Sequence, residues 1–148
     1  MGIKKNILIV VTLFLLRIVG YSQTYNFKNY NTREGLPQSQ VLSIFQDHNG
    51  FIWVGTNAGG VGKYDGYKFS KITDNEGLIN NVVFSITENH KNEMVFGTSK
   101  GISVFNGFSY KNYGEKSGLD NTWVFKILAD GEKVWIGTQA LSSPDFSP

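Results

Sequence analysis

An internal repeat is the feature that most constrains the fold of this chain of 148 residues. The pair Gly-Leu begins at Gly35, Gly77 and Gly118, at intervals of 42 and 41 residues. A second landmark, two apolar residues followed by Gly-Thr, has its glycine at Gly55, Gly97 and Gly137. Two landmarks with nearly the same period indicate a duplicated unit. A period of about 40–45 residues with short strand-like segments is typical of a β-propeller blade rather than of a helical repeat.

Four segments of each unit have the composition of β-strands. In the first unit they cover residues 41–46, 51–56, 61–65 and 67–73, separated by turns rich in Gly, Asn and Asp. Short β-branched and aromatic runs with such turns predict antiparallel hairpins. The first segment is apolar on both faces, as expected for an inner strand packed between neighbouring blades; its apolar residues are Val41, Leu42, Ile44 and Phe45. No sustained helical period follows residue 22, so we expect little helix.

The repeats divide the chain into an outer strand, two blades and part of a third blade. We expect the outer strand at residues 25–32, blades at 36–73 and 78–113, a partial blade at 119–138 and a non-repeat tail at 139–148. Residues 25–32 resemble the fourth strand of the first blade, because Phe27 and Phe69 are also 42 residues apart. In a closed propeller such a strand completes the last blade.

The predicted fold class is all-β, with a signal helix followed at residues 23–138 by an incomplete β-propeller of about two and a half four-stranded blades. A closed propeller has about 4–8 blades. We therefore expect the chain to be a truncated or frameshifted piece of a longer protein. Such a piece leaves sheet edges and an apolar face uncovered, so we also expect self-association through open blade edges.

The first 22 residues have the organisation of a secretory signal peptide. Two lysines precede the apolar run at residues 7–16, and Gly20 and Ser22 define a cleavage site before Gln23. The alternative is an uncleaved N-terminal anchor, because two further apolar residues extend the run. Arg17 interrupts it, however, and the run is shorter than the ~20 residues that a spanning helix needs. We therefore expect an exported, periplasmic protein, with its parent anchored in the inner membrane.

The charge of the exported part argues against nucleic-acid binding. The full chain has 14 basic and 12 acidic residues and a net charge of +2. The signal segment holds three of the basic residues and none of the acidic ones, which leaves −1 after cleavage. No later segment clusters Lys or Arg, so the basic surface that nucleic acid requires is missing. The chain has no Cys, which excludes disulfides, thiolate metal sites and a cysteine nucleophile.

The motifs of the first unit belong to a recognisable pattern. They are Glu34-Gly35-Leu36-Pro37, Asp47-x-x-Gly50-x-x-Trp53-Val54-Gly55-Thr56-Asn57 and Tyr64-Asp65-Gly66. This pattern resembles the two-component regulator propeller repeat, and the resemblance extends over residues 25–138. The second unit departs from it at Val95, Phe96 and Asn106, and the third is short.

The resemblance implies the periplasmic sensor region of a bacterial hybrid histidine kinase. In complete members it implies two stacked propellers, a β-sandwich, a membrane helix and a kinase core. The 148 residues contain no kinase portion, so we expect no kinase activity.

The sequence suggests no catalytic, metal or cofactor site. His48 and His90 are 42 residues apart at the same turn of successive units, so they are most simply turn residues. Neither has a cluster of metal ligands beside it, and no Gly-x-Ser-x-Gly nucleophile motif occurs. We therefore predict a protein that is not an enzyme and that has no cofactor.

Polar residues gather in the loops that precede the inner strands, and in propellers such blade-joining loops line one end of the central channel. The candidates for ligand binding are Gln38, Gln40, Asn80, Asn81, Asp120, Asn121 and Trp123. The alternative is that they are ordinary loop residues. Trp53 and Trp135 instead share one blade position, which favours packing between blades.

Two classes of function are compatible with these observations. The one we favour is a non-enzymatic binding module, an exported ligand-sensing fragment of a two-component sensor. By family analogy its ligand is a small molecule or an oligosaccharide. The second is a fragment of an exported propeller enzyme, a lyase or hydrolase, with its active site in other blades. Apart from these two classes, the chain could be a truncated product without function. The expected partners are the missing blades and the kinase portion of the parent.

Overall fold

The computed structural model describes residues 25–139, which form ten antiparallel strands in three sheets. The first sheet has the order β1 (Val41–Gln46), β2 (Ile52–Thr56), β3 (Val61–Tyr64) and β4 (Phe69–Ile72). The second has the order β5 (Val83–Glu88), β6 (Met94–Thr98), β7 (Gly101–Phe105) and β8 (Tyr110–Tyr113). The third holds β9 (Val124–Asp130) and β10 (Lys133–Thr138). The predicted signal peptide at 1–22 and residues 140–148 of the predicted tail lie outside the described residues.

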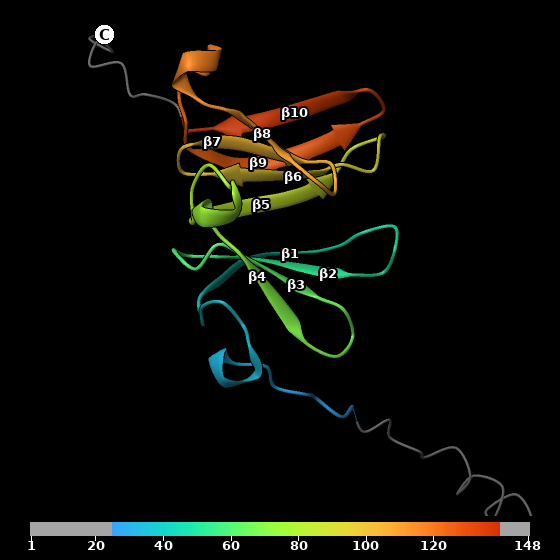
Figure 1. Cartoon of the computed structure of the whole chain (residues 1–148). Coiled ribbons are helices and arrows are strands. Elements are labelled where there is room, and N and C mark those ends of the chain that lie inside the picture. Colours follow the sequence, from blue (N-terminus) through green and yellow to red (C-terminus); the bar gives the residue numbers. More distant parts are fainter. Residues whose placement is uncertain (1–24, 140–148) are drawn as a thin grey trace, which may run out of the picture.

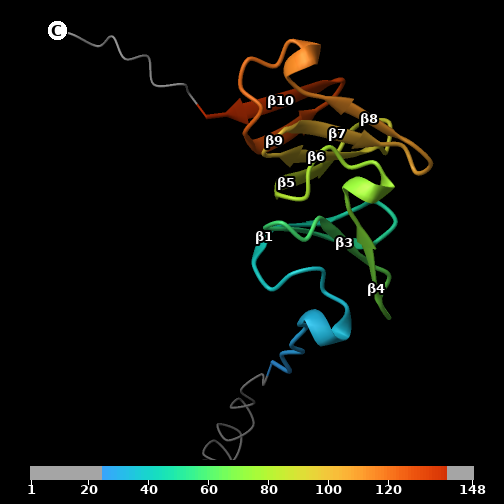
Figure 2. The same cartoon turned by 60° about the vertical axis from the view of Figure 1, so that its left-hand side comes forward.

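The three sheets are stacked in chain order (Figure 1). The first strand of each sheet forms a continuous inner row, because β1 contacts β5 and β5 contacts β9. Figure 2 shows the same stacking from a second side. Consecutive antiparallel sheets that pack through their first strands are the blades of a propeller. The predicted all-β, partial-propeller fold is confirmed.

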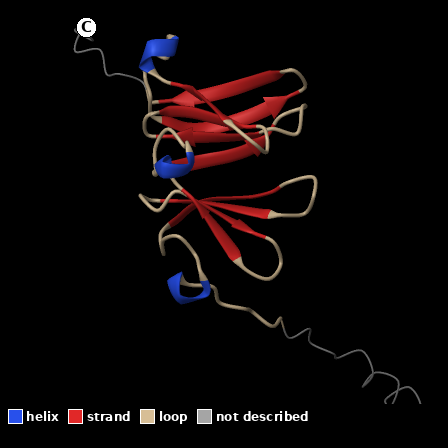
Figure 3. Ribbon diagram, in the orientation of Figure 1, coloured by secondary structure: helices blue, strands red, loops and turns tan. Residues whose placement is uncertain are grey.

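A short 3-10 helix precedes each Gly-Leu pair. The three helices are η2 (Thr32–Glu34), η3 (Asp74–Glu76) and η4 (Glu115–Ser117), and they lie on one side of the stack (Figure 3). Each ends at a glycine with positive φ, which reaches +113° at Gly77. In η3 the hydroxyl and the backbone N–H of Thr73 donate hydrogen bonds to the Glu76 carboxylate at 2.7 and 2.6 Å. These hydrogen bonds hold the pKa of Glu76 below its usual value.

Asp47 shapes the hairpin between β1 and β2 and holds Trp53 in place. Its Oδ1 accepts hydrogen bonds from the backbone N–H groups of Asn49 and Phe51 at 3.0 and 2.9 Å. Its Oδ2 accepts a hydrogen bond from the Trp53 indole N–H at 2.8 Å. The carboxylate is buried and fully engaged, so its role is structural.

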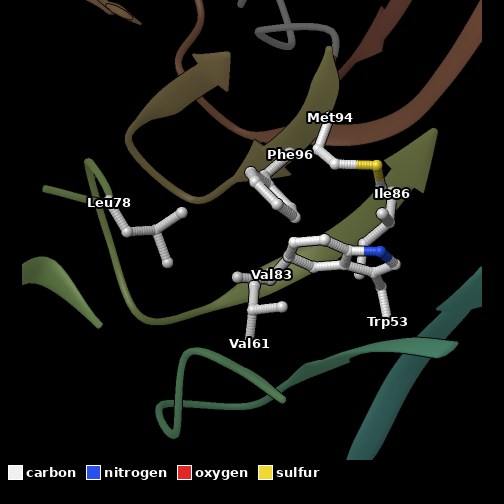
Figure 4. Packing of buried hydrophobic residues seen from close by; sticks show 7 residues of the cluster. All are labelled: Trp53, Val61, Leu78, Val83, Ile86, Met94 and Phe96. Carbon is white, nitrogen blue, oxygen red and sulfur yellow. The ribbon is translucent and has the colours of Figure 1, made fainter. Parts of the chain in front are cut away.

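The main hydrophobic core lies between the first and second sheets (Figure 4). Its buried members are Trp53, Val61, Leu78, Val83, Ile86, Met94 and Phe96. Trp53 is only 2% exposed, and its ring lies 5.7 Å from the ring of Phe96. We call the face that carries Phe45 and Trp53 in the first blade the trailing face of a blade. We call the face that carries Val83 and Ile86 in the second blade the leading face.

The second interface, between the second and third sheets, is incomplete. Val95 and Ile102 on the trailing face of the second blade pack against Val124 and Ile127 of the third. Beside them opens a cavity of about 380 Å³. Most of its lining is apolar and includes Val104, Tyr113, Leu119, Val134 and Ile136. In the first interface the equivalent place is taken by Phe105 and Tyr110, from the third and fourth strands of a blade.

The predicted outer strand at residues 25–32 is not formed. Residues 25–31 have no regular secondary structure, and Thr32 begins η2. A strand needs a neighbour for its backbone hydrogen bonds, and no strand of the described residues pairs with this segment. Tyr30 nevertheless keeps its place in the repeat, because its hydroxyl bonds that of Tyr64 at 2.7 Å and its ring packs on Phe69. The segment therefore covers the outer part of the leading face of the first blade.

Two expectations about packing between blades are also wrong in part. Trp53 is buried between blades as expected, but Trp135 at the equivalent position is 58% exposed, because no sheet of the described residues covers its face. The inner strands are not buried on both faces either. Leu42 and Ile44 are exposed in β1, and Phe125 is exposed in β9.

Candidate ligand-binding site

The predicted ligand-binding residues lie in three equivalent loops at the same end of successive blades. Each loop is tied to the neighbouring hairpin by one backbone hydrogen bond. In the first blade the Asn57 N–H donates to the Gln40 carbonyl at 3.0 Å. The equivalent bonds run from Ser99 to Val82 at 3.2 Å and from Gln139 to Trp123 at 3.3 Å. The loops are therefore built alike, and the structure brings the predicted residues together in a row.

Several of the predicted side chains shape the loops themselves. The Asn80 side-chain oxygen accepts hydrogen bonds from the Val82 N–H at 2.9 Å and from the Ser99 hydroxyl at 2.7 Å. Asn121 accepts a hydrogen bond from the Trp123 N–H at 3.0 Å, and Gln38 makes the corresponding bond to the Gln40 N–H. Side-chain oxygens that accept from a backbone N–H two residues later are turn-forming groups. These three residues thus have a repeated structural role.

The remaining polar candidates differ in how many of their hydrogen-bonding groups are available to a ligand. Asn81 is engaged with Asp74, to which it donates at 2.8 Å and from whose backbone N–H it accepts at 2.9 Å. Gln40 accepts a hydrogen bond from the Asn57 side chain at 2.8 Å. Asp120 is exposed, and its carboxylate accepts no hydrogen bond from residues 25–139. Asp120 is therefore the predicted polar residue with the most free hydrogen-bonding capacity.

An aromatic cluster lies beside these loops on the inner row of strands. The ring of Trp123 lies 5.9 Å from those of Phe84 and Phe125, and the two phenylalanine rings are 4.8 Å apart. Trp123 is 47% and Phe125 is 42% exposed, whereas Phe84 is half-buried. Leu42 occupies the equivalent position in β1 and is also exposed. The inner row thus presents an apolar, aromatic surface rimmed by polar loop residues.

Three β-bulges explain why these aromatic side chains are not buried between blades. The strand register shifts at Leu42 in β1, at Phe84 in β5 and at Phe125 in β9. A bulge inserts one unpaired residue and changes the direction of its side chain. In β5 it lets Val83 and Ile86 both enter the core while Phe84 does not. Phe84 and Phe125 were not among the residues predicted from the sequence, where the only signal for them is the pair of consecutive apolar residues that opens each inner strand.

His48 takes part in a contact with an acidic residue of the next blade. His48 pairs with Glu88 of β5 through its ring, and its backbone N–H donates to the same carboxylate at 2.9 Å. This contact joins two neighbouring blades. Within the described residues, no group of three or more His, Cys, Asp or Glu side chains could hold a metal ion. Across residues 25–139, no helix is long and apolar enough to cross a membrane.

A segment of the first repeat matches a known sequence family. Residues 35–58 match the two component regulator propeller. The match confirms the resemblance of the first repeat to this family. No curated protein matches the chain.

Among solved structures, the chain is similar to the extracellular domain of a protein described as a hybrid two component system, BT3049 from B. thetaiotaomicron. The two are 30% identical, the TM-score is 0.68, and the similarity covers 78% of this chain and 17% of that one. The chain therefore spans about a sixth of its relative's length. The extracellular domain of BT4673, a protein of the same organism described as a one component system, is 20% identical with a TM-score of 0.40. That similarity covers 78% of this chain and 23% of the relative.

Proposed function

We propose that this chain is an exported, non-enzymatic binding module that serves ligand sensing in a two-component system. The observation that carries the proposal is the exposed aromatic surface of Trp123, Phe125 and Phe84 beside the polar blade-joining loops. Small-molecule sites are typically apolar and aromatic with a few well-placed polar groups. Two findings support the sensing role: residues 35–58 match the two component regulator propeller, and the chain is similar to the extracellular domain of a hybrid two component system.

The ligand class that fits this surface is an oligosaccharide. Exposed aromatic rings present flat faces on which the apolar face of a sugar ring can stack. Asp120 supplies a free hydrogen-bond acceptor for hydroxyl groups. Trp123 is the central residue of the proposal, since its indole is exposed and contacts both phenylalanines.

The test is a binding assay with a panel of neutral, acidic and amino-sugar oligosaccharides. Binding is followed by calorimetry and by intrinsic tryptophan fluorescence. We expect Trp123→Ala to weaken binding at least about tenfold, or ~1.4 kcal/mol. Trp135→Ala is the matched control, because this tryptophan is also exposed but lies on a trailing face. We expect it to leave the affinity unchanged.

Two results contradict the proposal. One is the absence of binding to every sugar of the panel by a chain that shows a folded β-sheet spectrum. The other is binding that Trp123→Ala and Phe125→Ala both leave intact, because the recognition surface would then lie elsewhere. Circular dichroism of each variant separates loss of binding from loss of fold.

A further inference from the structure

We propose that the turns of the outer hairpins form a second binding surface, which takes a chain of neutral sugars. The stacking residues are Tyr67, in the hairpin that joins β3 to β4, and Phe108, in the hairpin that joins β7 to β8. We call residues 65–68 and 106–109 the tip turns. They are distinct from the aromatic cluster around Trp123, and this proposal does not depend on the ligand-sensing role.

The tip turns lie at the opposite end of the blades from the candidate ligand-binding loops. In a four-stranded antiparallel sheet with strands in chain order, successive connections alternate between the two ends. The turns after the first and third strands therefore share one end, and the loops that join blades leave from the other. In Figure 1 the hairpin between β3 and β4 lies on the opposite side from the short helices that precede the blade-joining loops. The two surfaces are separate, so each can be altered without changing the other.

Both tip turns are built by the same hydrogen bonds. In the first blade Asp65 Oδ1 accepts hydrogen bonds from the backbone N–H groups of Tyr67 and Lys68, both at 2.8 Å. In the second blade Asn106 Oδ1 accepts from the N–H groups of Phe108 and the residue after it, at 3.0 and 2.9 Å. The glycine of each turn has a positive φ, of 94° and 96°. Such side-chain bonds define a tight turn, so each aromatic residue is held on a closed turn rather than on a loose loop.

An aromatic residue recurs at this position in successive repeats. Tyr25, Tyr67 and Phe108 are separated by 42 and 41 residues. Trp53 shows that an aromatic residue of a repeat can serve packing between blades, but the tip turns are different. Tyr67 is 89% and Phe108 is 97% exposed. Within residues 25–139 neither of these two rings contacts another aromatic or a cationic side chain. Packing therefore does not explain why the position is aromatic.

The exposure of Tyr67 comes from its place in the blade and not from an uncovered sheet face. The first sheet has a neighbour on both sides, because the second blade packs on its trailing face and Tyr30 packs on the outer part of its leading face. Tyr67 is nevertheless almost fully exposed. Ile44 differs, because its equivalent Ile86 is buried by the adjacent blade. Packing of one blade on the next covers sheet faces, whereas a tip turn lies beyond the ends of the strands.

The charges of the tip turns favour a neutral ligand. The second turn, Asn106-Gly107-Phe108-Ser109, contains no charged residue. In the first turn Asp65 and Lys68 carry opposite charges. Hydrogen bonds from the backbone N–H groups of Lys68 and Tyr67 hold the pKa of Asp65 below its usual value. The ionised carboxylate keeps its second oxygen as an acceptor for hydroxyl groups. An exposed ring with a hydroxyl acceptor beside it suits a sugar, whose C–H face stacks on the ring.

One aromatic ring per blade favours a ligand that itself repeats. A single sugar covers one ring, whereas a chain of sugars can stack on the tips of successive blades. Contacts linked along one chain bind more tightly together than separately, because the first contact raises the local concentration for the next. Tyr and Phe have only two side-chain torsions, so little conformational entropy is lost at each contact. The inferred ligand is therefore a linear neutral polysaccharide rather than a disaccharide.

The test is affinity electrophoresis of the complete chain in gels that contain a soluble β-glucan, a galactomannan or starch. We expect at least one of these polysaccharides to retard the protein. Trp123→Ala should keep this retardation, because the residue lies at the other end of the blades. In that background Tyr67→Ala and Phe108→Ala should each weaken binding about tenfold, and the double substitution should abolish it. Trp135→Ala is the matched control, since it removes an exposed aromatic ring that is not on a tip turn.

Two further measurements identify the ligand and check the fold. Disaccharides from the retarding polysaccharide should compete at least about tenfold more weakly than the polymer. Vesicles of anionic phospholipid test a lipid surface as the alternative occupant, and we expect no co-sedimentation that depends on the tip residues. Circular dichroism shows whether each variant keeps its β-sheet spectrum, which we expect because Tyr67 and Phe108 are exposed.

Several outcomes overturn the proposal. They are the absence of retardation by all three polysaccharides, a double variant that moves like its parent, and a disaccharide that competes as well as the polymer. Vesicle binding that the double substitution removes would assign the tips to a lipid surface instead. Retardation that Trp123→Ala alone abolishes would place the polysaccharide on the inner surface. That last result would overturn this proposal and support the ligand-sensing one, so the two can fail separately.

Discussion

Trp53 and Trp135 hold the same position in the repeat, but Trp53 is buried and Trp135 is exposed. Trp53 lies in the core between two blades, with its indole N–H bonded to Asp47 and its ring against Phe96. Trp135 lies on the trailing face of β10, which no other sheet of residues 25–139 covers. Both are followed by an aliphatic residue, Gly and Thr.

This difference in burial shows that a repeat motif stabilises the fold only where a neighbouring blade covers it. A blade presents an apolar face that is useful only when the next blade covers it. Burial of a large aromatic ring stabilises a fold because apolar surface leaves water and close contacts form. The same residues on an uncovered face contribute neither effect, so equivalent substitutions at the two positions should have unequal consequences.

The largest difference is expected for the tryptophans themselves. Trp53→Ala should lower the free energy of unfolding by about 3–5 kcal/mol, because it empties a core position and leaves Asp47 without its indole partner. Trp135→Ala should change it by less than about 0.5 kcal/mol. Urea unfolding followed by circular dichroism, at concentrations where the chain is monomeric, measures both. Equal losses would show that Trp135 is buried in solution.

Gly55 and Gly137 follow Trp53 and Trp135 by two residues. We expect substitution of Gly55 to destabilise the fold more than substitution of Gly137, with a smaller difference than for the tryptophans. Gly55→Ala places a Cβ 2.8 Å from the Val83 carbonyl oxygen, so two inner strands must move apart. We expect a loss of about 1–3 kcal/mol, as for other overpacked sites. Gly137→Ala meets nothing closer than 3.6 Å and should be nearly neutral. Thermal unfolding of the two variants and the wild type measures these changes in stability. If Gly55→Ala is as stable as the wild type, the first two blades are packed more loosely than the structure shows.

The glycines of the Gly-Leu turns separate backbone strain from packing. Gly77 and Gly118 both have positive φ, so alanine at either should cost about 1–2 kcal/mol. At Gly77 the new Cβ also meets the Tyr110 ring at 2.7 Å, whereas nothing lies within 4 Å at Gly118. We expect Gly77→Ala to be the more destabilising by roughly 1 kcal/mol or more. Denaturant midpoints of the two variants measure this difference in stability. Equal midpoints would mean that the Tyr110 ring moves aside without cost.

The smallest expected effect concerns the capping of η3 and depends on pH. The pKa of Glu76 is lowered in the folded chain by its hydrogen bonds to Thr73. Its contribution to stability is therefore present above the unfolded pKa and is lost as the pH falls through the lower, folded pKa. Glu76→Gln should lower the melting temperature slightly at neutral pH and match the wild type in acid.

Glu115→Gln is the control for the capping prediction. It alters the corresponding helix η4, in which no side chain makes a cap hydrogen bond. We expect this variant to follow the wild type at every pH. A pH-independent deficit in Glu76→Gln would contradict the proposed origin of the effect.

Much of the fold could be predicted because each blade is specified by local signals. Turn residues at regular intervals and short β-branched runs predicted the four strands of both complete blades. The outer strand at 25–32 could not be predicted correctly, since a strand requires a partner and the composition of the segment says nothing about one. Tyr30 kept its equivalent place because an aromatic side chain can pack without a backbone ladder.

The candidate site was predicted less well, for a similar reason. The loops were correctly recognised as a repeated set, but polarity alone does not distinguish a turn-forming Asn80 from an available Asp120. Phe84 and Phe125 were overlooked, because a bulge changes the direction of a side chain without changing its hydrophobicity. Only the register of β5 and β9 revealed that they join Trp123.

The sequence by itself determined the all-β class, the blade repeat and the family resemblance, because hydrophobic pattern and turn chemistry act over a few residues. Tertiary structure alone decided which copy of each motif is buried, which aromatic residues reach the inner surface and which faces remain open. Those properties depend on what packs against a residue from a distant part of the chain, and identical motifs carry no information about their neighbours.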